Sequence, residues 1–116
     1  MPVYSSVAVW EFHVKPEARP DFERTYGPDG DWARLFRRSP DYRGTVLLRD
    51  RDRPSRYFTL DHWSSSEALS QFKRKHHADY TALDKQCEGL TEQETFLGDF
   101  EGLISDLLIS DLMDKR

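Results

Sequence analysis

One eight-residue segment, Arg56–Trp63, constrains the fold more than any other, because its alternate side chains form two different sets. Such a period of two indicates a β-strand. One side carries Phe58, Leu60 and His62, and the other carries Tyr57, Thr59, Asp61 and Trp63. We expect the first, more apolar set to face a layer of helices. The second set mixes aromatic and polar groups, which suits neither open water nor a dry core, so we expect something outside the helix layer to cover it.

Three further segments are predicted to be strands of the same sheet. Residues 3–14 alternate between two faces and end at Pro16, which has no N–H to donate. Residues 43–50 are joined to the segment above by a short charged connection, typical of a hairpin. Residues 91–100 form the fourth predicted strand, with Gly98 near its end.

The segments between the strands show helical spacing. Pro20 suits the first turn of a helix that ends before Gly27, and Asp31 is predicted to cap a second, short helix. The sequence Ser64-Ser65-Ser66-Glu67 resembles a capping box. It opens a helix whose apolar stripe is expected to run unbroken to Leu90. Residues 103–113 predict a last amphipathic helix.

This order of elements predicts an α+β fold, a ferredoxin-like four-stranded antiparallel sheet with helices on one face. A chain of 116 residues has room for one domain, which we place at residues 1–100, with residues 101–116 as a helical extension. No second layer remains to cover the mixed face of residues 56–63. We therefore expect a homodimer in which two sheets face each other across a shared cavity.

Composition excludes several classes of partner. The 17 basic and 21 acidic residues give a net charge of −4, which argues against nucleic acid. No apolar run is long enough to span a bilayer, and the first residues lack the pattern of a secretory signal, so we expect no membrane partner. Cys87 is the single cysteine, which fits a reducing cytoplasm and leaves no cysteine-based zinc site.

Several motifs resemble those of the antibiotic biosynthesis monooxygenase-like domains, in the dimeric α+β barrel superfamily. They are Glu11-Phe12-His13-Val14-Lys15-Pro16-Glu17, Tyr26-Gly27-Pro28-Asp29-Gly30-Asp31-Trp32, Gly44–Asp50, Asp61-His62-Trp63 with Ser65 and Glu67-Ala68, and Leu97-Gly98. The resemblance covers about residues 3–100. It implies a dimeric α+β barrel and leaves the activity open, since this superfamily hosts oxygenases, heme degraders, isomerases and decarboxylases.

The sequence departs from two branches of that superfamily. Heme-degrading relatives use an Asn, a Trp and a His; this chain has no Asn, and Phe72 and Ala82 stand where the Trp and His would be. Quinone-forming relatives share a Trp at the position of Trp63, but Thr59 and Leu69 replace their Asn and Tyr. Heme degradation is therefore disfavoured, and a quinone-forming reaction would need a different substrate.

Eight residues are candidates for the site. Trp63 could stack on an aromatic substrate, while Asp61, His76 or His13 could accept a proton. The residues predicted to contact substrate are Tyr57, Thr59, Trp10 and Phe72. For each a structural role is the alternative: Trp63 could pack at the dimer interface, Asp61 could pair with an arginine, and His76 could be a hydrogen-bonded core histidine.

Metal and cofactor motifs are absent from the sequence. His76 and His77 diverge by about 100° on a helix and cannot both reach one ion. Nor does a Gly-rich nucleotide motif or a P-loop occur. The leading prediction is a cofactor-independent, metal-free monooxygenase that acts on a small aromatic or polyketide-like compound. As the resemblance implies, a base would deprotonate a phenol, whose anion would pass an electron to O2. Two alternatives remain, a non-catalytic ligand-binding or interaction module, and an isomerase or decarboxylase on the same scaffold.

Overall fold

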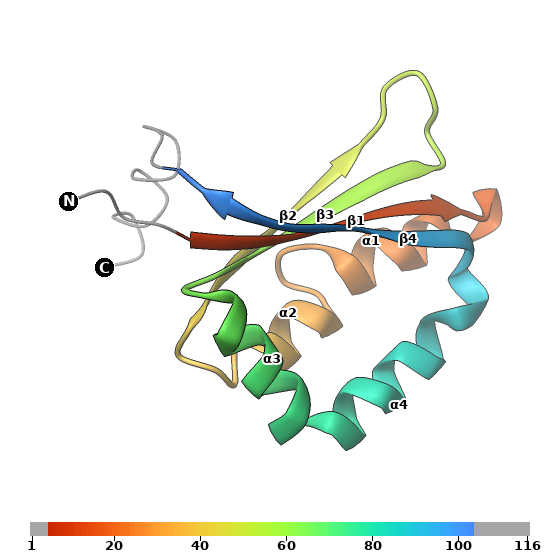
Figure 1. The fold of residues 1–116 in the computed structure, drawn as a ribbon. Coiled ribbons are helices and arrows are strands. Elements are labelled where there is room, and N and C mark those ends of the chain that lie inside the picture. The colour runs from red at the N-terminus through yellow and green to blue at the C-terminus, as the bar shows by residue number, and fades with distance from the viewer. Residues whose placement is uncertain (1–4, 104–116) are drawn as a thin grey trace.

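The computed structural model describes residues 5–103 and contains one four-stranded sheet and four α-helices in that range (Figure 1). In chain order the elements are β1 (Ser5–Val14), α1 (Arg19–Tyr26), α2 (Asp31–Phe36), β2 (Tyr42–Arg49), β3 (Arg56–Trp63), α3 (Ser66–Lys75), α4 (His77–Cys87) and β4 (Thr91–Gly102). Short 3-10 turns at Pro16–Ala18 and Glu88–Leu90 precede α1 and β4. The helix predicted over residues 103–113 lies outside the described residues, apart from Leu103.

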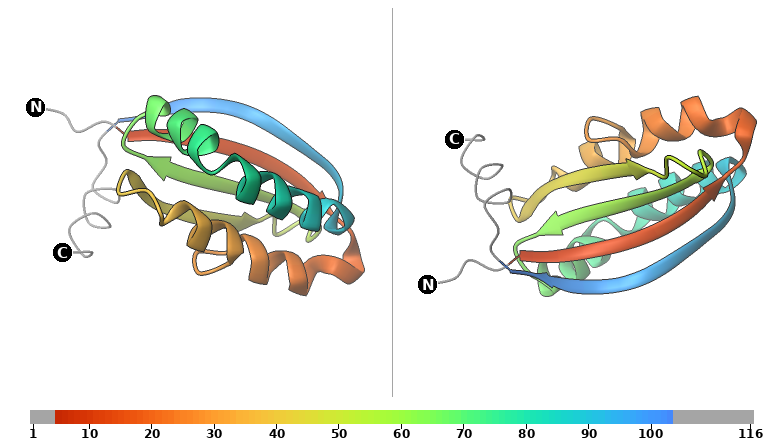
Figure 2. Two further views of the ribbon diagram at one scale, coloured as in Figure 1. Left: turned by 90° about the horizontal axis from the view of Figure 1, so that it is seen from below. Right: turned by 90° about the horizontal axis from the view of Figure 1, so that it is seen from above.

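The predicted sheet is confirmed. Its strand order is β2-β3-β1-β4, and every neighbouring pair is antiparallel. All four helices lie against one face of the sheet. The view from the other side shows that the opposite face is free of helices (Figure 2). Within residues 5–103, no helix combines the length and the hydropathy that a bilayer crossing requires.

The predicted orientation of β3 is wrong. Tyr57, Thr59 and Trp63 are buried beneath the chain's own helices, at 0%, 4% and 1% exposure, so the mixed set faces the helix layer. Phe58 and Leu60 lie on the helix-free face. The prediction placed the more apolar set inward, but two polar side chains of the mixed set, Tyr57 and Asp61, have hydrogen-bond partners on the inner side. The Tyr57 hydroxyl donates to Glu23, and Asp61 accepts from Thr45. A polar group that is hydrogen-bonded can be buried at little cost.

Two details of the helices also differ from the prediction. The long stripe breaks at His76, where φ is −111° and ψ is 32°, so that two helices replace one. This bend lets Phe72 of α3 pack against Phe36, while Cys87 of α4 reaches the far end of the core. The residue that caps α3 is Ser65, whose hydroxyl accepts from the Ala68 N–H at 3.1 Å.

Asp31 was predicted to cap the short helix. It is instead the first residue of α2, after Gly30 at the cap position, and its carboxylate pairs with Arg34. Both shifts amount to one residue, the usual uncertainty where several polar residues could each begin a helix.

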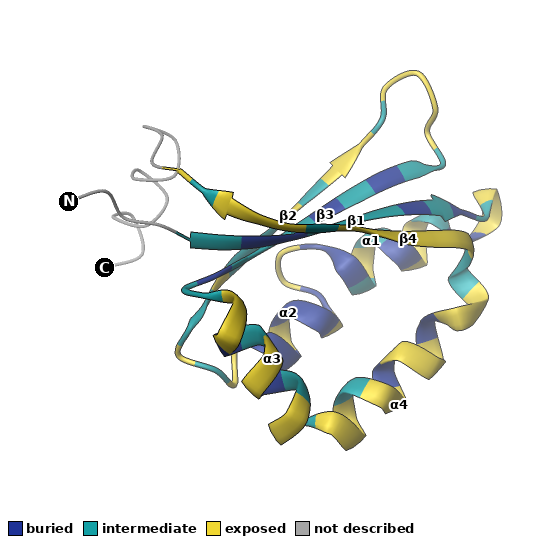
Figure 3. Ribbon diagram, in the orientation of Figure 1, coloured by how far each residue is buried: buried dark blue, intermediate teal, exposed yellow. Residues whose placement is uncertain are grey.

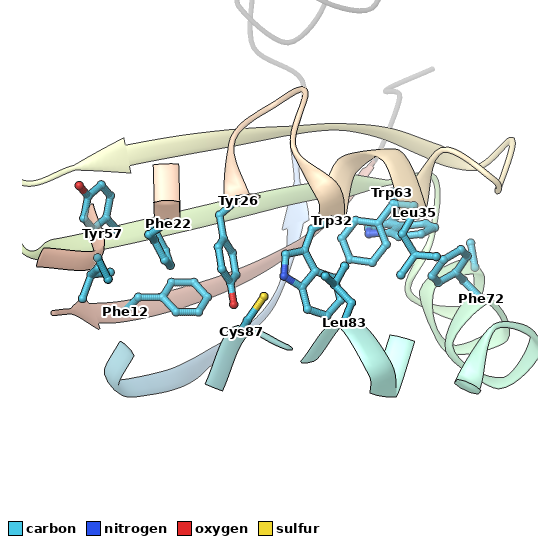
Figure 4. Packing of buried hydrophobic residues seen from close by; sticks show 14 residues of the cluster. Phe12, Phe22, Tyr26, Trp32, Leu35, Tyr57, Trp63, Phe72, Leu83 and Cys87 are labelled. Carbon is cyan, nitrogen blue, oxygen red and sulfur yellow. The ribbon is translucent and has the colours of Figure 1, made fainter. Parts of the chain in front are cut away.

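Buried residues occur along the central strands and on the helices (Figure 3), and the core that they form consists largely of aromatic rings (Figure 4). Phe22 and Tyr26 of α1 stack with ring centroids 4.2 Å apart, and Phe12 of β1 lies 5.2 and 5.0 Å from them. At the other end, Phe36 and Trp63 meet at 5.3 Å. Aromatic pairs in such offset or edge arrangements add to the stability gained from burial.

The helix-free face of the sheet is apolar along β2 and β3. Val46 and Leu48 lie opposite Leu60 and Phe58 in the register, and residues that pair directly share a face. Val46 is 38% exposed and Leu48 46%, and Phe100 on β4 is 51% exposed. We call this surface, formed by Val46, Leu48, Phe58, Leu60 and Phe100, the outer face.

Candidate functional site

A cavity of about 120 Å³ lies between the sheet and the helices, inside a single chain. Six aromatic side chains contribute to its wall: Trp10, Phe12, Tyr26, Trp32, Phe36 and Tyr80. Trp32 is central among them, with ring centroids 5.0 Å from Tyr80, 5.7 Å from Phe36 and 6.1 Å from Tyr26. An apolar cavity of about 150 Å³ in another protein holds a benzene molecule. The space here therefore suits a single aromatic ring.

Four polar residues complete the wall: Thr59, Asp61, Asp84 and Glu94. Thr59 and Asp61 are two residues apart on β3 and so point to the same face of the strand. Asp84 lies one helical turn after Tyr80 on α4, which brings both to the same side of that helix. Asp84 and Glu94 are exposed, whereas Thr59 is buried and Asp61 is partly buried. The cavity therefore runs from an acidic mouth to an interior with one carboxylate.

A bulge in β4 sets the position of Glu94. The register between β1 and β4 shifts between Val9 and Trp10, and Gly98 at this point has φ of 143°, a conformation that favours glycine. After the bulge, Phe96 pairs with Trp10, and the two rings lie 5.1 Å apart. Glu94 pairs with Phe12 and so points toward the helices.

Asp61 has the electrostatics of a general base. Its partial burial disfavours the charged form and raises the pKa to about 6, against which the Thr45 hydrogen bond and the Lys73 charge act only in part. The Thr45 hydroxyl donates to Asp61 Oδ1 at 2.6 Å. The only hydroxyl proton of Thr45 is engaged in this bond. In the contact between Tyr42 and Thr45, the Tyr42 hydroxyl is therefore the donor and the Thr45 oxygen the acceptor. At pH 7 most Asp61 side chains are ionised. The pKa of Asp61 is also close to this pH, which lets the carboxylate accept a proton effectively.

The tyrosines at the cavity remain neutral near pH 7. Burial raises the pKa of Tyr80 to about 12 and that of Tyr26 further. Burial and the charges of Asp84 and Glu88 also raise the pKa of Glu94. Trp32 Nε1 is buried and has no hydrogen-bond partner among the described residues, and it points toward the Tyr26 hydroxyl and the Cys87 thiol (Figure 4).

Of the eight residues predicted for the site, the structure brings three to this cavity. They are Trp10 on β1 and Thr59 and Asp61 on β3. Trp10 shows which face of β1 turns toward the helices, because it packs against the core on that side.

Trp63, Phe72 and Tyr57 are buried elsewhere in the core. Trp63 and Phe72 pack against each other with ring centroids 5.5 Å apart, and Trp63 Nε1 has no partner among the described residues. Tyr57 lies under α1, where its hydroxyl donates to Glu23 at 2.5 Å. None of the three is part of the cavity wall.

The two histidines lie away from the cavity wall. His76 occupies the bend between α3 and α4, and its ring packs against Phe72 in a tilted arrangement, with ring centroids 4.7 Å apart. His13 lies 3.3 Å from Glu11, and both alternate with Phe12, which faces the helices. His13, predicted as a possible proton acceptor, therefore lies with Glu11 on the opposite face of the sheet from this cavity.

Sequence reasoning missed most of the aromatic wall and both exposed acids. Tyr26, Trp32, Phe36 and Tyr80 lie at helical spacing from other apolar residues, a pattern that core packing and a cavity wall share. The spacing of Tyr80 and Asp84, four residues apart on one helix, was a usable signal for the mouth. Glu94 could not be found in this way, since the bulge at Gly98 decides its direction.

Comparisons with known proteins agree with the fold. The family model of the antibiotic biosynthesis monooxygenases matches residues 5–82. A search of curated proteins finds no match. Among solved structures, a "putative antibiotic biosynthesis monooxygenase" from Bordetella bronchiseptica is 18% identical with a TM-score of 0.67, over 87% of this chain and 97% of that one.

Two more structures are similar at comparable levels. SnoaB, a cofactor-independent oxygenase from Streptomyces nogalater, is 21% identical with a TM-score of 0.56, over 87% of this chain and 91% of that one. A conserved protein from Methanosarcina mazei is 13% identical with a TM-score of 0.59, over 88% and 92%. Identities this low support the fold alone, whereas the family model covers more than half of the chain. This protein belongs to the antibiotic biosynthesis monooxygenase family.

Proposed function

We propose that the protein is a cofactor-independent monooxygenase whose substrate is a small phenolic compound bound in the cavity between the sheet and the helices. The observation that carries this proposal is Asp61, a carboxylate with a pKa of about 6 on the wall of a largely aromatic cavity. A base is the one protein group that the reaction requires, because an electron-rich phenolate can itself reduce O2. The family supports oxygenation as the chemistry.

The reaction balances without a cofactor when the substrate has a CH2 group conjugated with the phenol. Asp61 removes the phenolic proton, and the anion transfers one electron to O2, which gives a substrate radical and superoxide. The substrate radical loses a proton from its CH2 group and combines with superoxide at that carbon. Protonation of the peroxide then gives a hydroperoxide. Loss of water breaks the O–O bond and leaves C=O, so CH2 and O2 become C=O and H2O. The carbon loses four electrons and O2 gains four.

The residues of the cavity serve this sequence in distinct ways. The rings of Trp10, Trp32 and Tyr80 hold a planar substrate and exclude water from the radical pair. Asp61 accepts the proton, and its hydrogen bond from Thr45 fixes the carboxylate. The chain Asp61–Thr45–Tyr42 leads away from the cavity and offers the proton a path along hydroxyl groups.

Two copies of the chain would associate through the outer face. Its exposed apolar residues, among them Leu48 and Phe100, form the kind of surface that soluble proteins usually cover with a partner. The resemblance to dimeric α+β barrels supports the same arrangement. In this proposal each protomer keeps its own cavity, and the dimer interface contains no active site.

Turnover in air and under argon tests the function. A panel of phenols and hydroquinones that carry a CH2 group on the ring is incubated with the protein, and products are measured by mass spectrometry with 18O2. The proposal predicts one labelled oxygen in the product in air and no product under argon. Asp61→Asn should lower the rate by about 100-fold or more, the usual contribution of a general base. Asp52→Asn, in the exposed hairpin, should leave the rate unchanged. Equal product with and without oxygen would contradict the oxygenase assignment.

A second candidate, a non-catalytic small-molecule-binding module, is favoured by one observation. Thr59 and Leu69 occupy the positions at which quinone-forming relatives have Asn and Tyr, and Trp63 is packed in the core rather than on the cavity wall. Such a module would bind phenols with similar affinity in Asp61→Asn and would form no labelled product. The same experiment therefore separates the two candidates.

A further inference from the structure

The ionisable groups on the cavity wall are nearly all acidic. Asp61, Asp84 and Glu94 contribute three carboxylates, and no Lys or Arg side chain is among the described residues that line the cavity. Glu88 adds to this potential, because its charge raises the pKa of Glu94. An anionic ligand would meet like charges at the mouth and again inside.

A positive charge near the site partly compensates the negative charge of these carboxylates. Lys73 of α3 acts on Asp61 through its charge, and its Nζ lies 5.4 Å from the centroid of the Tyr80 ring. This ammonium already occupies one aromatic face at the edge of the cavity. Three carboxylates against one ammonium still leave the site negative, and Asp84 and Glu94 lie at the exposed end.

Aromatic rings and carboxylates together form a site for a cation. The face of a Trp or Tyr ring is negative and attracts an ammonium within about 6 Å, more strongly where water is excluded. The wall includes the rings of Trp10, Trp32 and Tyr80 together with Asp84 and Glu94, and Tyr80 and Asp84 lie on one side of α4. A ligand with an aromatic ring and an ammonium would satisfy both kinds of group at once.

We propose that the cavity selects a cationic aromatic compound, a phenol with an ammonium group on a short side chain, over neutral and anionic phenols of the same size. The ammonium faces Asp84 and Glu94, and the ring enters the aromatic part of the cavity. The ring oxygen then meets Asp61 or the unpartnered N–H of Trp32, which is 8% exposed. This inference rests on the proposed function for the phenol, whereas the preference for positive charge rests on the cavity alone.

Binding of three matched phenols tests the charge preference without any turnover. Tyramine, 4-ethylphenol and 3-(4-hydroxyphenyl)propionate share the phenol ring and the first two side-chain carbons. Tyramine adds an ammonium to these carbons, the propionate adds a carboxylate, and 4-ethylphenol adds no charged group. Their dissociation constants are measured by calorimetry under argon at pH 7.5. We expect tyramine to bind about tenfold more tightly than 4-ethylphenol, and the propionate to bind weakest. Higher salt should reduce the difference between tyramine and 4-ethylphenol.

Variants assign the effect to the acids at the mouth. Asp84→Asn and Glu94→Gln should each weaken tyramine binding about threefold or more and leave 4-ethylphenol unchanged. Lys73→Gln removes the compensating ammonium and should strengthen tyramine binding. Asp52→Asn is the matched control outside the cavity. Circular dichroism checks that each variant is folded.

Equal affinities for tyramine and 4-ethylphenol, tighter binding of the propionate, or no binding of any of the three at millimolar concentration would overturn the inference. Its fate is separable from that of the proposed function. Selective binding of tyramine with no oxygen-dependent product leaves the charge preference standing and removes the oxygenase. Oxygen-dependent turnover that is the same for each charge of the side chain leaves the oxygenase standing and removes the charge preference.

Discussion

Replacement of Thr45 by Val removes the hydroxyl that holds the Asp61 carboxylate and leaves the shape of the side chain nearly the same. The Thr45 hydroxyl donates to Asp61 Oδ1 at 2.6 Å, and this bond favours the ionised form of Asp61. Without this hydrogen bond, less opposes the effect of burial, which disfavours the ionised carboxylate. The pKa of Asp61 must therefore rise.

The size of the change follows from two constants. A hydrogen bond to a charged group is worth about 1.5–3 kcal/mol, and one pKa unit corresponds to about 1.4 kcal/mol. The pKa of Asp61 should move from about 6 to about 7–8 in Thr45→Val. At pH 7 the ionised fraction of Asp61 then falls from about 90% to about 10–50%. The rate at pH 7 should drop about two- to tenfold and recover at pH 9.

The pH dependence of kcat/KM for a phenol substrate measures this change, and the 13C resonance of the Asp61 carboxyl gives the pKa independently of turnover. Thr95→Val, at an exposed position of β4 opposite Glu11, is the matched control and should leave both unchanged. An acid limb that stays near pH 6 in Thr45→Val would refute the assignment of Asp61 as the base. A carboxyl resonance that fails to move would refute the electrostatic argument itself.

Three further predictions concern stability and assembly. Asp61→Asn should raise the free energy of unfolding at pH 7 by about 1–3 kcal/mol. The cause is that wild-type Asp61 has a folded pKa of about 6 against an ordinary value of 3.8, so its contribution to stability declines as pH rises from about 4 to 6. Urea titrations at pH 4 and pH 7 measure the free energy of unfolding of the wild type and of Asp61→Asn. An equal difference between the two proteins at both pH values would contradict this reasoning. Leu60→Glu, in the middle of the outer face, should give a species of 13.7 kDa by sedimentation where the wild type sediments as a dimer; a monomeric wild type would contradict the proposed interface. Ser65→Ala removes the cap of α3 and should cost about 1 kcal/mol in thermal or urea unfolding, whereas Ser66→Ala should have little effect.

The sequence was sufficient to predict the sheet and its helices because their signals are local. The alternation over residues 56–63 and the turn residues after each strand determine a strand without reference to the rest of the chain. Strand β3 has the bounds that the alternation predicted, and Ser65 differs from the predicted start of the next helix by one residue. Local patterns of this kind survive in almost any tertiary context.

The orientation of β3 was not predictable in the same way. Counting apolar residues placed Phe58 and Leu60 inward, but the inner face accepts Tyr57 and Asp61 because Glu23 and Thr45 provide hydrogen bonds from distant parts of the chain. Partners separated by 34 and 16 residues leave no trace in a local pattern. The outer face is apolar for a different reason in the proposed dimer, where a second copy covers it.

The candidate site was predicted in part for the same physical reason. Asp61 stood out as a carboxylate among aromatic residues, and its raised pKa follows from burial that the prediction anticipated for a different cavity. Trp63 was singled out by resemblance, yet it packs between Phe36 and Phe72 in this chain. Which rings line a cavity and which fill the core depends on helix placement within a few ångströms, and on the bend at His76.

The location of a bound phenol tests the account most directly. A crystal structure of the protein with tyramine, grown and soaked under argon, should place the aromatic ring between the sheet and α4 of one chain. The phenol oxygen should lie within hydrogen-bond distance of Asp61 or Trp32 Nε1. A ring bound between two outer faces, or a cavity filled by its own side chains while the ligand binds on the surface, would contradict the account.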